Sequence, residues 1–371
     1  MARKNRIVVN DGIYHLTTRI AHREMLLKVD DLKSKIVNWI YDIAAFSGVE
    51  LLAWCIMDNH LHILAHMPTV PEEYWLDPNV PPTTATFTIR PSACTPPRWY
   101  ADGDCPPDWN NALPRPPIGF MLSDEDMIKR LEFLYGSDIA EKKEEAWNAK
   151  RLNGRGNEVD EEKERYCRRM YNVSQFAKTL KERIAMRYNA DKRNNHAGCL
   201  FQGRFHSVVV EKNRESYAAI LAYIAANPVK AGIAKTCADW KWSSYGIACR
   251  GDSPHAGQCR QVYCKLLGCA EWKEAKAKME QLLSDRLPDG YDFERDGFTY
   301  GTVEINGVER KVPLRVTQVI WLKVRAFTQG SFFSRNLVFA QEALSELPKG
   351  FNHAGMWSVE MLNRLNWTNV A

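Results

Sequence analysis

The hydrophobic and polar positions near the start of the chain change period twice, which predicts one strand, one helix and two further strands. Residues 12–20 (GIYHLTTRI) alternate and are rich in β-branched and aromatic side chains, as is typical of a strand. Residues 28–46 carry apolar side chains at helical spacing, namely Leu32, Ile36, Trp39, Ile40 and Ile43. Residues 49–57 and 61–67 are apolar, β-rich runs separated by Asp58, Asn59 and His60, a hairpin-like break. This order is the first half of a ferredoxin-like split βαβ unit.

The second half of such a unit is found more than a hundred residues later. Residues 173–188 have a helical pattern, residues 206–211 (HSVVVE) resemble a fourth strand, and residues 215–226 predict a strong helix that ends at Asn227 and Pro228. These elements complete a βαββαβ unit only if the last helix and the fourth strand exchange their order along the chain. We therefore predict an α+β fold: a ferredoxin-like split βαββαβ core, with helices on one face of an antiparallel sheet, formed by residues 1–67 and 173–246.

Two regions fall outside this core. Residues 68–172 form a long insertion, whose part 68–117 holds thirteen of the eighteen prolines and whose remainder is charged and predicted helical, with Ser123 as an N-cap. Residues 247–371 are expected to form an α-rich accessory domain of unknown role. It contains a hairpin signal at Asn306 and Gly307, and helices are predicted over 317–328 and 331–347.

Composition excludes several classes of protein. No stretch approaches the roughly 20 apolar residues that a membrane span requires, and the basic N-terminus has no apolar segment of the signal-peptide type. Ten cysteines without a CxxC pair are too sparse for a disulfide scaffold in 371 residues, so reduced thiols in the cytoplasm are expected. The net charge of +5 is a mild bias toward polyanions.

Two histidines give the sharpest chemical signal. His60 and His62 are two positions apart in a predicted strand, so their side chains project from the same face and offer two imidazoles to one metal ion. The alternative is that both are ordinary strand histidines satisfied by hydrogen bonds.

A second signal lies on the predicted helix that precedes Pro228. Tyr223 and Asn227 are four residues apart and are therefore neighbours on one helix face. The alternatives are core packing for the tyrosine and a helix stop for the asparagine.

The third signal is basic. Residues 178–193 hold six Lys or Arg against two acidic residues, and aromatic side chains follow at Phe201 and Phe205. Clustered cations with interleaved aromatic rings suit phosphates and stacked bases. A solvated helix face is the alternative.

Together these motifs resemble the HUH single-tyrosine transposases, and more closely the branch of REP-associated tyrosine transposases, which share an IS200-like domain. Five ordered segments carry the resemblance: YHLTTR at 14–19, LLAWCIMDNHLHILAH at 51–66, GCLFQGRFHSVVVE at 198–211, LAYIAANPVKAGI at 221–233 and DWKWSSYG at 239–246. The long insertion and the sequence YIAANP, which lacks a histidine and a leucine common in that branch, depart from the pattern.

The resemblance implies a role for each matching residue. Tyr223 is expected to be the nucleophile that forms a 5′-phosphotyrosine link, and His60, His62 and Asn227 are expected to bind Mg²⁺ or Mn²⁺. The implied partner is single-stranded or hairpin DNA, handled by a monomer or a homodimer. The cations expected to contact that DNA are Arg19, Lys178, Lys181, Arg183, Arg187 and Arg204, with residues 178–204 lying across the face of the active site.

Two alternatives remain open on the sequence alone. One is a catalytically silent protein on the same fold that binds hairpin DNA or RNA. The other is a metal hydrolase that uses His60 and His62, for which Asp58 is the only acidic ligand nearby in the sequence.

Overall fold

The structure is a computed structural model, and it describes residues 8–80, 82, 118–191 and 199–284, together with the backbone of three short strands nearer the C-terminus. All structural statements below concern these residues. Most of the proline-rich stretch and the predicted helix over 317–328 lie outside them.

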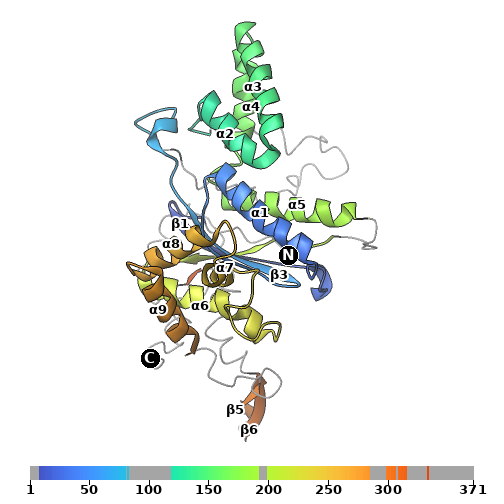
Figure 1. The fold of residues 1–371 in the computed structure, drawn as a ribbon, viewed down its shortest axis with the longest axis vertical. Coiled ribbons are helices and arrows are strands. Elements are labelled where there is room, and N and C mark those ends of the chain that lie inside the picture. Colours follow the sequence, from blue (N-terminus) through green and yellow to red (C-terminus); the bar gives the residue numbers. More distant parts are fainter. Residues whose placement is uncertain are drawn as a thin grey trace, which may run out of the picture.

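A central antiparallel sheet organises the molecule (Figure 1). Its strand order is β2-β3-β1-β4, the order of a ferredoxin-like fold. A short fifth strand, β7 (Phe332–Phe333), pairs in parallel with β4, within the range predicted as a helix over 331–347, so that prediction is wrong at these two residues. The bounds of the four main strands are β1 (Gly12–Arg19), β2 (Glu50–Ile56), β3 (His60–Met67) and β4 (His206–Val210). The predicted α+β class is confirmed.

One face of the sheet is covered by α1 (Asp30–Ser47) and α5 (Val173–Ala190). Ile36, Ile40 and Phe176 are fully buried there against the side chains of the strands. Because α5 precedes β4 along the chain, the elements follow the ordinary βαββαβ order. The predicted exchange of the last helix and strand is therefore wrong.

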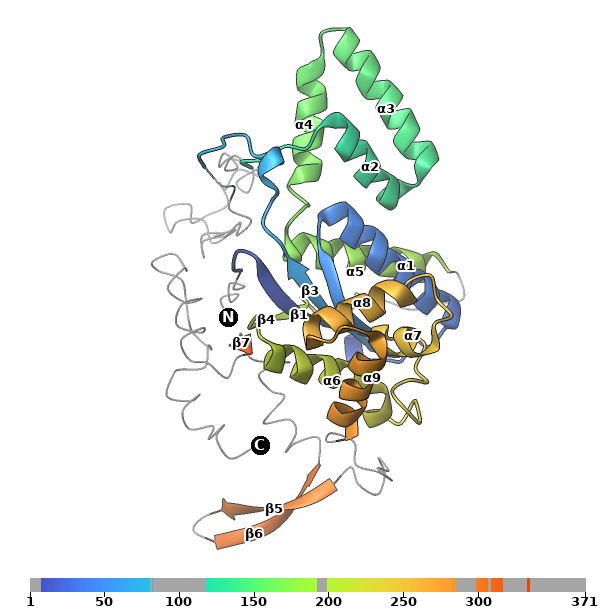
Figure 2. The same cartoon turned by 60° about the vertical axis from the view of Figure 1, so that its left-hand side comes forward.

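The other face is covered as well, so the prediction that helices lie on one face needs correction. Here α6 (Arg214–Lys230), α8 (Ala256–Leu267) and α9 (Trp272–Ser284) form a second core with the sheet. Figure 2 shows α1 and α5 on one side of the strands and these helices on the other. The strands are apolar on both faces, with Ile13, Leu64 and Val208 turned toward α6, and an apolar face must be covered. The predicted boundary at residue 247 falls inside α7 (Ser244–Arg250).

The described part of the insertion is a helical arm. It consists of α2 (Asp124–Tyr135), α3 (Ser137–Leu152) and α4 (Gly156–Cys167), which extend away from the sheet (Figure 2). The predicted N-cap is present, since the Ser123 side chain accepts a hydrogen bond from the amide of Asp126. Met127 and Leu131 of α2 are buried in the core that contains α1, which attaches the arm to the body.

The remaining elements are short. Two 3₁₀ turns, η1 (Ala21–Arg23) and η2 (Glu72–Tyr74), follow β1 and β3. The predicted hairpin is present: β5 (Phe298–Ile305) pairs with β6 (Val308–Arg315) on either side of residues 306 and 307. Among the described helices, none combines the length and the apolar character needed to cross a membrane.

Candidate active site

The register of the sheet places a row of polar side chains on the face that α6 covers. Arg19 of β1 lies opposite His60 of β3, and Thr17 lies opposite His62. Directly opposed residues share a face, and so do residues two positions apart. His15, Thr17, Arg19, His60 and His62 therefore all project toward α6, in a sheet region that is otherwise apolar.

The predicted histidine pair is brought together. The ring centroids of His60 and His62 are 4.8 Å apart, and His62 is 2% exposed. Burial, and then the nearby positive charge of Arg19, lowers the pKa of His60 to about 3, although Asp58 acts in the opposite sense. Burial, with His60, His15 and Arg19 as further causes, also lowers the pKa of His62 well below its ordinary value. Both imidazoles are therefore neutral at physiological pH, which is the form that binds metal ions.

A third histidine, His15, was not predicted from the sequence and completes this cluster. His15 is fully buried, its Nε2 lies 3.0 Å from Nδ1 of His62, and the two rings are stacked with centroids 5.2 Å apart. The available signal was the alternation within YHLTTR, which puts His15 on the same face as Thr17 and Arg19. Using that signal required the register between β1 and β3, which sequence alone does not supply.

Tyr223 of α6 lies over the two buried histidines. Its ring is edge-on to both, with centroids 5.5 Å from His62 and 5.7 Å from His15, and the residue is 7% exposed. The start of α6 is fixed by the Asn213 side chain, which accepts a hydrogen bond from the amide of Ser216. The predicted nucleophile and the predicted histidine pair thus form one cluster.

Asn227 lies one turn further along α6, where the predicted helix end proves wrong. The helix continues through Pro228 to Lys230. Proline lacks the N–H that would pair with the carbonyl of Ile224. The Asn227 side chain compensates, because Nδ2 donates to the carbonyl oxygens of Tyr223 (2.8 Å) and Ile224 (3.4 Å). With the nitrogen engaged in this way, Oδ1 is the amide atom suited to a metal ion.

The side chains present fit the expected divalent cation. Nε2 of His62 is buried and has no hydrogen-bond partner, which is costly for a polar atom that binds nothing. Within the described residues, no group of three or more His, Cys, Asp and Glu side chains is arranged to hold a metal ion. A metal site at His60 and His62 would therefore need a further ligand that is not His, Cys, Asp or Glu.

Two of the predicted DNA-contacting cations lie at the His60 end of the sheet. Arg19 is opposite His60, and its carbonyl accepts a hydrogen bond from the amide of Gln202 at 2.8 Å. Arg204 is exposed in the segment between Gln202 and β4. Desolvation, and then Arg23, lowers the pKa of the Arg19 guanidinium, whereas the neighbouring Tyr223 acts in the opposite sense.

The other four predicted DNA-contacting cations are on α5, which packs on the opposite face of the sheet. The expectation that residues 178–204 lie across the active-site face is therefore wrong for this helix. Lys181 donates to the carbonyl of Gly203 at 2.6 Å, and Arg183 donates to the carbonyl of Leu134. Lys178 pairs with Glu182 at 3.7 Å and Arg187 with Asp31 at 3.6 Å. A basic face does not determine on which side of a sheet a helix packs. The apolar face determines it, and the apolar face of α5 packs against α1.

Comparison with known proteins bears on the part of the chain that carries the histidines. Residues 8–72 match the family model described as transposase IS200 like. The resemblance to this family is thereby confirmed over a segment that contains β1, α1, β2 and β3. Among solved structures, one described as a REP-associated tyrosine transposase bound to a REP hairpin is similar at 14% identity, with 68% of this chain and 89% of that chain covered and a TM-score of 0.34. No curated protein matches the chain.

Proposed function

We propose that this protein is a metal-dependent transposase that nicks and rejoins single-stranded or hairpin DNA through Tyr223, since residues 8–72 match IS200-like transposases. The observation that carries the proposal is the cluster on the α6 face of the sheet. The ring centroid of His62 lies 4.8 Å from that of His60 and 5.5 Å from that of Tyr223, and Nε2 of His62 is buried without a hydrogen-bond partner.

The proposed chemistry is an in-line phosphoryl transfer. Tyr223 Oη attacks the phosphorus, the bond between phosphorus and the 3′ oxygen breaks, and a 5′-phosphotyrosine forms. The phenol loses its proton and the departing 3′ oxygen gains one, so atoms and charge balance. The link conserves the energy of the broken bond, and rejoining therefore needs no ATP.

Four side chains would take part in this reaction besides Tyr223. His60, His62 and Asn227 would hold Mg²⁺ or Mn²⁺, which supplies charge neutralisation at a non-bridging phosphate oxygen. Arg19 is close enough to Tyr223 for their charges to interact. Its guanidinium favours the phenolate form of the nucleophile.

The test is a covalent adduct. Full-length protein is incubated with single-stranded hairpin oligonucleotides and Mn²⁺, and a protein–DNA band that survives denaturation is expected. Tyr223→Phe removes only the hydroxyl and should abolish that band. Tyr217→Phe, on the same helix, is the matched control and should retain it. An adduct that persists in the Tyr223→Phe protein excludes Tyr223 as the nucleophile.

A second candidate function is hairpin binding without cleavage. The burial of Tyr223 (7% exposed) and His62 (2% exposed) favours it, because DNA reaches neither side chain without local opening of α6. In that case the wild-type protein binds hairpins in the same assay and forms no adduct. A metal hydrolase is less well supported, since its candidate acidic ligand, Asp58, is paired with Lys33 at 2.5 Å.

A further inference from the structure

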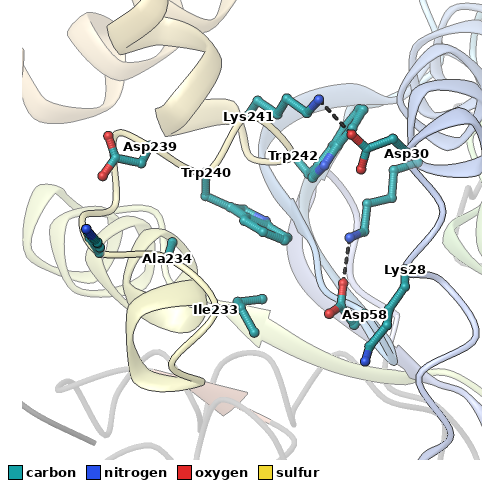
Figure 3. Close-up of a pocket in the computed structure, with 11 residues that line it drawn as sticks. Lys28, Asp30, Asp58, Ile233, Ala234, Asp239, Trp240, Lys241 and Trp242 are labelled. Atoms are coloured by element: carbon teal, nitrogen blue, oxygen red, sulfur yellow. Dashed lines mark hydrogen bonds and ion pairs between the residues drawn. The ribbon is translucent and has the colours of Figure 1, made fainter.

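A cavity of about 610 Å³ opens beside the candidate active site (Figure 3). Three parts of the chain surround it: the turn between β2 and β3, the first residues of α1, and the segment that follows α6. Asp58 belongs to the turn, Lys28 and Lys33 to the α1 region, and Ile233, Lys235 and Trp240 to the segment after α6. A cavity of this size suits a ligand of nucleotide dimensions.

The cavity adjoins the candidate active site through two of its walls. Asp58 precedes His60 by two residues in the turn between β2 and β3, which is closed by the amide of Met57 donating to the carbonyl of His60 at 2.8 Å. Ile233 follows Asn227 by six residues, and its amide donates to the carbonyl of Pro228 at 3.0 Å. Two walls of the cavity are thus continuous with the chain segments that carry His60 and Asn227.

The aromatic wall is held in place by the edge of the sheet. The indole nitrogen of Trp240 donates to the carbonyl of Ile56 at 3.1 Å, and the amide of Ile56 donates to the carbonyl of Trp242 at 2.8 Å. Trp242 itself is 8% exposed and packs in the core, whereas Trp240 is only partly buried and its ring extends into the cavity in Figure 3. The wall is thus formed before any ligand arrives.

Around the Trp240 ring, the cavity is lined by both acidic and basic side chains. The ammonium of Lys33 lies 4.7 Å from the centre of the Trp240 ring and pairs with Asp58 at 2.5 Å. Lys241 similarly pairs with Asp30 at 2.8 Å. The Lys33 side chain is only 3% exposed, so the first pair presents its carboxylate, whereas both members of the second pair are exposed. Carboxylates repel a bare phosphate, but they accept hydrogen bonds from the amino groups of bases.

Two further lysines line the cavity. Lys28 and Lys235 are exposed, and no ion pair joins either of them to another side chain of the described segments. They are available to the phosphates on either side of a base whose edge meets Asp58 and whose face meets Trp240.

We propose that this cavity binds one unpaired base of the DNA strand, adjacent to the phosphate that Tyr223 attacks. The proposal rests on the proposed function, and it adds a specificity site to it. The base inserts between Trp240 and Ile233, and its polar edge is read by the carboxylate of Asp58, which Lys33 holds in place.

The experiment is a binding measurement without metal or cleavage. Hairpin oligonucleotides with unpaired flanks are prepared with an abasic site at each flanking position in turn, and their Kd values are measured by fluorescence anisotropy in EDTA. Wild-type protein should lose about tenfold in affinity at one flanking position, in line with the loss of one stacked base. Trp240→Ala protein should bind the intact and the abasic oligonucleotide at that position with equal affinity.

Three controls keep the outcome interpretable. Trp240→Phe retains a ring and should keep most of the discrimination, and a thermal melt of both variants reports on folding. Lys235→Ala should weaken binding of every oligonucleotide by a similar factor, whereas Lys178→Ala, on the opposite face of the sheet, should not.

The proposal is overturned by any of three results. These are a wild-type protein that is insensitive to every abasic site, a Trp240→Ala protein that keeps the tenfold loss, and free deoxynucleoside monophosphates that compete as well as the hairpin does. The adduct assay with Tyr223→Phe separates this failure from failure of the proposed function. If the adduct forms but no flanking base is discriminated, the proposed function is supported and the base-binding cavity is excluded. If the protein does not bind the hairpin, both proposals are excluded.

Discussion

At the scale of single residues, the hydrogen bond between His15 and His62 decides which nitrogen of His62 is available to a metal ion. A neutral imidazole carries one N–H. If Nδ1 of His62 donates to Nε2 of His15 across their 3.0 Å separation, then Nε2 of His62 keeps its lone pair. That Nε2 is the buried atom without a hydrogen-bond partner. We infer that His15 acts as a positioning residue that fixes this tautomer, as a carbonyl or carboxylate does behind many ligating histidines.

His15→Ala should therefore weaken Mn²⁺ binding by about 10- to 100-fold, the usual cost of losing such an outer partner. Binding is measured by titration of the DNA-free protein, with free Mn²⁺ followed by electron paramagnetic resonance. His62→Ala should remove the site, and His15→Gln, which retains an acceptor, should recover part of the affinity. His66→Ala, further along the same strand face, is the control and should bind normally. Wild-type affinity in His15→Ala would show that His62 does not need this partner.

At the scale of elements, the identity of each helix and strand was largely predictable and its location was not. The alternation in β3 predicted correctly that His60 and His62 share one face, because strand periodicity is a local property. The side of the sheet on which α5 lies depends on non-local packing of Phe176 and Ile184 against α1, which charge patterns do not report. For the same reason a basic sequence does not reveal which face of the sheet α5 covers.

The corrected arrangement predicts where salt dependence resides. Replacing both Arg19 and Arg204 by alanine should lower the slope of log Kd against log salt for hairpin binding by about 1.4 to 1.8, since each phosphate contact contributes about 0.7 to 0.9. Replacing Lys178 and Arg187, a matched pair on α5, should leave the slope unchanged. The measurement is hairpin affinity at several salt concentrations. A lower slope in the α5 variant instead would mean that DNA crosses the α1 face.

The helical arm offers a test by pH. Asp124 of α2 accepts hydrogen bonds from Arg151 of α3 (2.8 Å) and Lys163 of α4 (2.7 Å), so one carboxylate joins three helices. The hydrogen bond from Arg151, followed by Lys163, lowers the pKa of Asp124 to about 2, although partial burial opposes this. Because the folded-state pKa lies below the unfolded value of about 3.9, the stabilisation is present above pH 4 and is lost as the pH falls toward 2.

Asp124→Asn should destabilise the arm by about 1 kcal/mol near neutral pH, a value reduced for partial solvent screening. The measurement is amide hydrogen exchange of α2, α3 and α4, which should be about fivefold faster in the variant at pH 6. The difference in stability should fall to about half at pH 3. Asp138→Asn, at an exposed position of α3, is the control. A difference that does not depend on pH would contradict the assignment to the ionised carboxylate.

At the scale of the whole molecule, the sheet has a core on each face, and the helices after residue 246 complete the second one. Tyr263, Leu267, Ala275 and Met279 are all at most 1% exposed in the cluster that contains α6. The Tyr263 hydroxyl lies 3.2 Å from Ser244 Oγ, which in turn accepts from the amide of Trp54 in β2. The sequence suggested an accessory domain because nothing local marks α8 and α9 as partners of strands two hundred residues earlier. Helix amphipathicity predicts that a face is buried, not what covers it.

A chain that ends at residue 246 should therefore fail to fold, and this last prediction distinguishes an integral layer from an accessory domain. Losing α8 and α9 exposes the faces of α6 and β2 that Tyr263, Leu266, Leu267 and Met279 cover. Each large buried side chain is worth about 1.5 to 3 kcal/mol, so their sum is comparable to the 5 to 15 kcal/mol of a typical domain. Soluble yield and thermal unfolding followed by circular dichroism are the measurements, and a chain ending at residue 284 is the control that retains both helices. A cooperative transition in the shorter chain, at a temperature close to that of the full-length protein, would mean that α6 and the site it carries fold without α8 and α9.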